Sequence, residues 1–188
     1  MQLDKAIQER KSVRHFSKKS PNWKDIVTCI DAARYAPTAG NIHPMKWMLV
    51  NDKDTIKKLA NAAQQNFITE AKYVVVLCTE SKRVLNAYEE RAEKFCRQQA
   101  GAAIENFLLK LQEKKLATCW VGYFVDYLVK EALNIPDEID VEAFFPIGYE
   151  PKQKGKKRKT RNKLDMDKML YVNKWKNKKL NPEKKLNV

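Results

Sequence analysis

The chain has 188 residues, of which 44% are hydrophobic and 10% aromatic, with only 5 Gly and 7 Pro. This composition excludes a collagen-like, linker-like or wholly disordered protein and predicts one packed fold. The formal net charge is +14, but residues 151–188 hold 15 Lys and Arg against 3 Asp and Glu, so the excess lies in a basic C-terminal segment.

Apolar spacing predicts the helices and strands in chain order. Apolar residues at steps of three and four predict helices over residues 2–10, 23–33, 56–63 and 128–133. A helix in two pieces is expected over residues 82–115, with a turn at residues 101–103. Short apolar runs predict strands at residues 46–50, 73–78 and 141–149, and residues 116–123 form a strand or an extended loop.

The strand at residues 73–78 is continuous and β-branched, so we expect it to be the central strand, buried on both faces. Pro146 places the last strand near an edge or a bulge. Helices and strands alternate without a clean βαβ rhythm. This order favours an α+β fold in which helices flank a mostly antiparallel sheet.

Several catalytic and metal-binding patterns are missing from the sequence. It has no glycine-rich nucleotide loop, no zincin motif and no nucleophile elbow. The cysteines stand singly in apolar patterns, which predicts buried thiols in a reducing compartment: Cys29, Cys78, Cys96 and Cys119. With no signal peptide and no long apolar run, we expect a soluble cytoplasmic protein with neither a metal site nor a membrane span.

Short segments remain as candidate binding elements. In an extended segment Arg10, Ser12 and Arg14 point to one side and form a fork for a phosphate, although a solvated basic loop is equally compatible. Residues 36–41 are small and leave backbone amides accessible, or they simply end a helix. Gly122 permits a flat ligand to approach the main chain.

Taken in order, these segments resemble the nitroreductase family of FMN-dependent oxidoreductases. The motifs are RKSVRHF, APTAGNIHP, GAAIENFLLKLQEKKLATCWVGYF and FPIGYEP followed by KTRNKLD. The resemblance spans residues 1 to about 170. It implies the fold of that family, an intertwined homodimer and FMN held at the interface by residues of both subunits.

The resemblance also implies roles for individual residues. Arg10 and Ser12 match positions that hold the flavin phosphate, with Lys11 in the same segment, and Arg14 matches a basic residue near N1 and O2 of the flavin. Lys159 and Arg161 match a pair that closes on the phosphate. The loop that lies along the isoalloxazine from the other subunit matches Pro37, Thr38, Ala39 and Asn41, and the backbone near N5 matches Val121 and Gly122.

The activity that this resemblance implies is hydride transfer from NADH or NADPH, through flavin N5, to an electron-poor acceptor such as a nitroaromatic or quinone. The flavin carries the chemistry, so no catalytic side chain is required. Dehalogenation or ring oxidation on the same fold is the alternative. His43 and Met45 depart from the usual family pattern, which affects substrate access.

Domain boundaries are expected at residues 1–165 for the FMN-binding domain and 166–188 for a basic extension that packs on the partner subunit. The lysine-rich end also raises the possibility of nucleic-acid binding. We weigh that lower, because Tyr171 and Trp175 are the aromatic residues interleaved with its charges.

Overall fold

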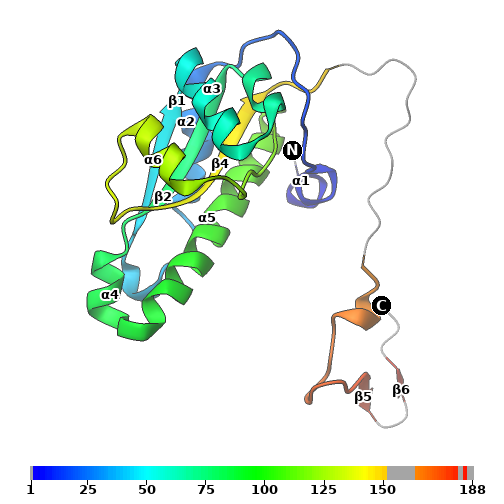
Figure 1. The fold of residues 1–188 in the computed structure, drawn as a ribbon. Helices are drawn as coiled ribbons and strands as arrows, with labels where there is room; N and C mark the ends of the chain where they lie inside the picture. Colours follow the sequence, from blue (N-terminus) through cyan, green and yellow to red (C-terminus); the bar gives the residue numbers. More distant parts are fainter. Residues whose placement is uncertain (1, 152–163, 182–183, 186–188) are drawn as a thin grey trace. The chain divides into compact units, whose positions relative to one another are not determined.

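An antiparallel sheet in the order β1-β2-β4-β3 organises the first of the two units of the chain, Met1–Lys152 (Figure 1). The computed structural model describes residues 2–151, 164–181 and 184–185. The strands of this sheet are β1 (Met45–Val50), β2 (Tyr73–Thr79), β3 (Ala117–Thr118) and β4 (Asp140–Gly148).

Helices cover both faces of the sheet. Buried side chains of α2 and α5 pack on one face, and those of α3 and α6 pack on the other. This arrangement confirms the expected α+β fold with an antiparallel sheet between helices. The helices of the unit are α1 (Leu3–Glu9), α2 (Trp23–Ala33), α3 (Lys53–Ala63), α4 (Lys82–Tyr88), α5 (Ala92–Glu113) and α6 (Asp126–Leu133), with short 3₁₀ turns η1 (Ala39–Asn41), η2 (Asn66–Glu70) and η3 (Glu89–Arg91).

Strand β2 is the central strand that its apolar run predicts. It pairs antiparallel with β1 on one side and β4 on the other, and residues 74–79 are all buried. Val75 and Leu77 face the cluster with α2 and α5, whereas Val74 and Val76 face the cluster with α3 and α6. The side chains therefore alternate between two apolar layers, which explains why no polar residue interrupts the run.

The expected turn at residues 101–103 is wrong. Helix α5 continues through Gly101, and the break before it falls at η3 instead, where Glu89 has φ 47°. The small residues Ala100 and Ala103 are buried against α2 and the sheet. These small side chains permit close helix packing without ending the helix. Small residues by themselves therefore do not predict a turn at this position.

Pro146 lies inside an internal strand rather than an edge strand, but that strand does carry a bulge, at Glu142, so the second of the two expected placements holds. Strand β4 has β2 on one side and β3 on the other. The pairing of Val121 with Phe144 continues the register of β3 and sets Pro146 opposite Cys119. Because proline has no N–H to donate, the ladder cannot continue there, and β3 ends at Thr118.

The N-terminal segment after α1 runs along the outer side of β3. The Val13 N–H donates to the carbonyl of Thr118 (2.8 Å), and Ser12 forms a parallel bridge with the same residue. Further along, the Ser17 N–H donates to the carbonyl of Tyr149 (2.8 Å). We call residues 10–17 the N-terminal strap. It covers the exposed edge of the short strand β3.

The second unit, Gln153–Val188, has its own internal contacts. The Asn177 side-chain amide donates to the carbonyls of Val172 (2.8 Å) and Lys179 (3.1 Å). The Lys178 ammonium donates to the carbonyl of Asp167 and lies 4.0 Å from the centre of the Tyr171 ring. Its described elements are η4 (Met166–Lys168), β5 (Lys179–Asn181) and β6 (Lys184–Lys185). In the described ranges of both units, no helix is long and apolar enough to cross a membrane.

Candidate functional site

The N-terminal strap presents the predicted phosphate-binding side chains. Ser12 and Arg14 are exposed, while Val13 between them is buried, as alternation along an extended segment requires. The Arg10 Nε lies 3.5 Å from Glu105 Oε1 on α5. That contact uses Nε, and a guanidinium has two further nitrogens that can donate to a second partner.

Lys11 differs from its neighbours on the strap. Its ammonium forms an ion pair with Glu150 Oε1 at 2.5 Å, just after β4 ends. This contact joins the strap to the end of the sheet. The other basic pair expected at the phosphate, Lys159 and Arg161, lies outside the described residues.

The predicted flavin-contacting loop forms a tight turn. Gly40 and Asn41 both have φ 57°, in the left-handed region that glycine and asparagine tolerate best. Asn41 Oδ1 lies 3.2 Å from His43 Nε2. With the imidazole as donor, the carboxamide of Asn41 keeps its N–H groups for another partner. The unusual His43 is thereby explained as a local support of the loop.

Side chains of α4 and α5 hold this loop from behind. Tyr88 stacks edge-on against Phe95, with ring centres 5.0 Å apart, and both rings pack, as Ile42 does, against one buried cluster of α4 and α5. A Cβ on Gly40 would lie only 2.5 Å from the Tyr88 hydroxyl oxygen. The loop therefore sits against an aromatic support that leaves no room for a side chain at this glycine.

A pocket opens between the loop and the first half of α5. Its volume is about 220 Å³. Gln99 is only 5% exposed, yet neither its side-chain oxygen nor its nitrogen has a hydrogen-bond partner among the described residues. A buried amide without a partner is costly, so this group is suited to a ligand. The pocket is lined by Pro37, Thr38, Ala39, Phe95, Gln98, Gln99 and Ala102.

Sequence reasoning found the loop side of this pocket and missed the helix side. The signal was present, because Gln99 lies on the same helical stripe as the buried residues Ala92, Cys96 and Ala103. A glutamine inside an apolar stripe of spacing three and four is buried by the helix geometry alone. It should have marked a candidate binding residue on α5.

The segment after β3 carries the backbone predicted to lie near N5. Val121 exchanges two backbone hydrogen bonds of 3.0 Å with Phe144, which fixes the segment against β4. Gly122 follows and is exposed, with the Trp120 indole folded beside it. The Thr118 hydroxyl is buried without a partner in the described chain. This segment thus combines a rigid anchor with an accessible glycine backbone.

Helix α5 links the candidate segments. The strap meets the end of β3 through Val13 and Thr118, directly before the segment with Val121 and Gly122, and it reaches α5 through Glu105. The loop meets α5 at Gln99, six residues earlier on the helix. At a rise of 1.5 Å per residue these two positions lie about 9 Å apart along the helix axis.

Burial makes Cys29 and Cys78 unsuited to nucleophilic chemistry. All four are free and buried. Burial raises the pKa of the Cys29 thiol to about 12 and that of Cys78 to about 11. These thiols are protonated near neutral pH and are therefore poor nucleophiles. In the part of the chain that the structure describes, no group of His, Cys, Asp and Glu side chains is arranged to hold a metal ion.

These features define an α+β protein with a pocket formed by a short loop and a long central helix. The model of the nitroreductase family matches residues 7–149. The chain belongs to the nitroreductase family and is an oxidoreductase.

The chain is similar to proteins that carry the names of different enzymes. A protein of Archaeoglobus fulgidus with a provisional NADH dehydrogenase/NAD(P)H nitroreductase name is 28% identical, covering 80% of this chain and 86% of its own. An iodotyrosine deiodinase of Thermotoga neapolitana is 26% identical, covering 78% and 88%. The solved structure of an FMN-dependent nitroreductase from Clostridium difficile has a TM-score of 0.75 at 20% identity, covering 90% and 98%, and shares the fold.

Proposed function

We propose that this protein is an FMN-dependent oxidoreductase that passes electrons from NADH or NADPH to an electron-poor acceptor such as a nitroaromatic or quinone. The observation that carries the proposal is the pocket at Gln99, where a buried amide without a partner meets the predicted flavin loop. Membership of the nitroreductase family supports the same chemistry.

The pocket fits one edge of a flavin ring system better than a whole ligand. Its volume of about 220 Å³ is below the roughly 300 to 1,000 Å³ of complete small-molecule sites. The Gln99 amide offers a donor and an acceptor side by side, which complements a ring edge carrying N–H and C=O groups. Pro37, Ala39 and Ala102 supply apolar contact for a flat ring.

The strap supplies charge for the phosphate of the cofactor. Arg10 and Arg14 would donate charged hydrogen bonds to it, and the Ser12 hydroxyl would add a further donor. Lys159 and Arg161 are proposed to complete this set. Across the site, the backbone of Val121 and Gly122 would orient the reactive edge of the ring through an amide.

FMN, when bound, would supply two-electron redox chemistry, with hydride taken from NADH or NADPH and electrons delivered to the acceptor. The residues of the chain then bind, orient and shield the ring, and none is required as a nucleophile. This division of roles agrees with the high thiol pKa values of Cys29 and Cys78. The free, buried cysteines also suit the cytoplasm, which we propose as the location.

We propose a homodimer in which the strap of one subunit and the loop of the other complete each site. Exposed apolar side chains support a further interface, because Trp23 is 49% and Val27 is 44% exposed on α2. The C-terminal residues 166–188 are proposed to pack on the partner subunit. Trp175, at 79% exposure, is available for such a contact.

Dehalogenation is the second candidate function. It is favoured by the iodotyrosine deiodinase of Thermotoga neapolitana among the relatives of this chain. Both candidates require the same cofactor, so the acceptor distinguishes them. Nucleic-acid binding by the basic end is a weaker alternative, tested by the salt dependence of DNA binding.

The test is to titrate the purified protein with FMN and follow quenching of flavin fluorescence, then to screen acceptors with NADH and with NADPH. We expect saturable binding, followed by turnover of nitroaromatics or quinones. Turnover restricted to halogenated phenols would select the second candidate. Failure to bind FMN at all would contradict both.

A further inference from the structure

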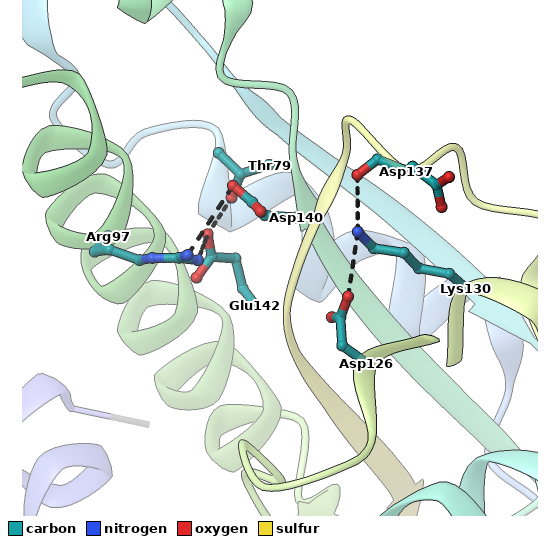
Figure 2. A network of polar contacts seen from close by, with 7 residues as sticks. All are labelled: Thr79, Arg97, Asp126, Lys130, Asp137, Asp140 and Glu142. Atoms are coloured by element: carbon teal, nitrogen blue, oxygen red, sulfur yellow. Dashed lines mark hydrogen bonds and ion pairs between the residues drawn. The ribbon is translucent and has the colours of Figure 1, made fainter. Parts of the chain in front are cut away.

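A buried carboxylate ties the pocket helix to the sheet. Arg97 reaches from α5 to the start of β4, where its Nη1 lies 2.6 Å from Glu142 Oε1 (Figure 2). The same oxygen accepts a hydrogen bond of 2.5 Å from the Thr79 hydroxyl at the end of β2. The other terminal nitrogen, Nη2, lies 4.0 Å from Asp140. We call this group the Arg97 clamp.

A β-bulge aims Glu142 at the clamp. In the register of β2 with β4, Leu77 pairs with Ala143 and Cys78 with Val141, so Glu142 is an extra residue without a partner in β2. Val141 and Ala143, two residues apart, consequently face opposite clusters of the core. Bulges re-aim a side chain in this way, and here the re-aimed group is a carboxylate.

The surroundings of Glu142 make its partners necessary. Its side chain is 9% exposed, and Thr79 is completely buried. The hydrogen bond that Arg97 donates to Glu142 raises the pKa of the Arg97 guanidinium. A buried carboxylate is tolerated when it is paired and hydrogen-bonded, so Arg97 and Thr79 are the groups that allow this charge to lie there.

The clamp acts on the turn of α5 that forms the pocket wall. Arg97 stands between Phe95 and Gln99, and both of these residues line the pocket. The Gln99 amide has no hydrogen-bond partner of its own in the described chain, so its position depends on the placement of the helix. Successive residues of a helix are rotated by about 100° about its axis and shifted by 1.5 Å along it. A small slide or rotation of α5 therefore changes the direction in which the Gln99 amide points.

We propose that Arg97 is a positioning residue for the ligand pocket. Its clamp to Glu142 and Thr79 fixes the first half of α5 so that Phe95 and Gln99 meet the loop at residues 37–39. The part of this inference that concerns the ligand rests on the proposed flavin function. The part that concerns the helix does not.

The first experiment measures the helix in protein freed of flavin. Hydrogen exchange followed by mass spectrometry is compared for Glu142→Gln and for a matched control, Asp25→Asn. Asp25 pairs with Lys114 at 3.0 Å, just beyond the other end of α5, so both variants remove one carboxylate that holds this helix region. We expect about tenfold faster exchange over residues 95–102 in Glu142→Gln, and unchanged exchange there in Asp25→Asn. Equal exchange over residues 95–102 in Glu142→Gln and the unaltered protein would overturn the proposal, as would uniform acceleration along the chain.

The second experiment measures the ligand. We expect Glu142→Gln to weaken FMN binding at least fivefold and to change the visible circular dichroism of the bound flavin, with Asp25→Asn within twofold of the unaltered protein. Arg97→Lys keeps the positive charge but loses the planar pair of guanidinium donors, so its FMN affinity should lie between those of Glu142→Gln and Asp25→Asn. Unchanged affinity and dichroism in Glu142→Gln would show a merely structural clamp. If the unaltered protein binds no FMN, the proposed function fails, and the exchange pattern alone decides the role of Arg97.

Discussion

Gly40 lies so close to Tyr88 that a Cβ on the glycine would stand 2.5 Å from the tyrosine hydroxyl oxygen. The glycine also has φ 57°, which is unfavourable for any residue with a Cβ. Both facts act on the same loop, which forms one wall of the pocket. The loop is thus constrained by its own backbone and by the aromatic support behind it.

The variant Gly40→Ala should lower stability by about 1–3 kcal/mol and weaken FMN binding, because the loop must move away from Tyr88. Gly101→Ala is the matched control, since nothing lies within 4 Å of a Cβ at that position in α5. It should raise stability by about 0.5–1 kcal/mol. Chemical unfolding and FMN titration measure both. Equal behaviour of the two variants would contradict this account of the loop.

Gln99→Leu should have opposite effects on stability and on binding. Removing a buried amide that lacks a partner should stabilise the flavin-free protein by about 1 kcal/mol. The same change removes the polar contact offered to the ligand and should weaken FMN binding about tenfold. Gln112→Leu, farther along α5, is the control for added hydrophobicity. Tighter FMN binding in Gln99→Leu would place the ligand elsewhere.

Arg10→Ala should weaken FMN binding by about 10- to 150-fold, the equivalent of one charged hydrogen bond. Its ion pair with Glu105 is partly exposed, so the loss of stability should stay below about 1 kcal/mol. Arg34→Ala removes a comparable exposed pair with Asp31 at 2.8 Å and should leave FMN binding unchanged. Unaltered affinity in Arg10→Ala would mean that the phosphate binds at another place.

Alkaline pH should destabilise the fold through the buried thiols. The pKa of Cys29 rises from 9.0 to about 12 and that of Cys78 from 9.0 to about 11, because burial disfavours the thiolate. Below pH 9 both states hold these protons, and above it the unfolded state releases them first. Stability is therefore lost as pH rises from 9 toward 11, by about 1.4 kcal/mol per thiol for each pH unit. Urea unfolding between pH 8 and 10 measures the slope, which should be shallower in Cys29→Ala.

The positions of the main strands could be predicted from the sequence because their signals are local. Strand β2 is a continuous apolar run, and its burial between two helical layers follows directly from that run. The break at Glu89 had no such signal, because the residue with positive φ is neither glycine nor asparagine. Tertiary packing imposes that conformation, and no local preference predicts it.

Those parts of the candidate site that have local sequence patterns could likewise be predicted. The strap and the loop have recognisable local patterns, whereas Arg97 and Glu142 are separated by 45 residues and meet through a bulge. A bulge shifts which face a residue takes, and its position depends on the pairing of two strands. Gln99 is intermediate: its burial could be predicted from its place on the apolar stripe of α5, whereas the pocket beside it could not.

The most direct test of the central claim is an anaerobic titration of the FMN-loaded protein with NADH and with NADPH, followed by absorbance at about 450 nm. The account predicts that at least one nicotinamide removes this absorbance in a stoichiometric step, and that an electron-poor acceptor restores it. A protein that stays colourless after incubation with FMN, or bound FMN that neither nicotinamide reduces, would contradict it.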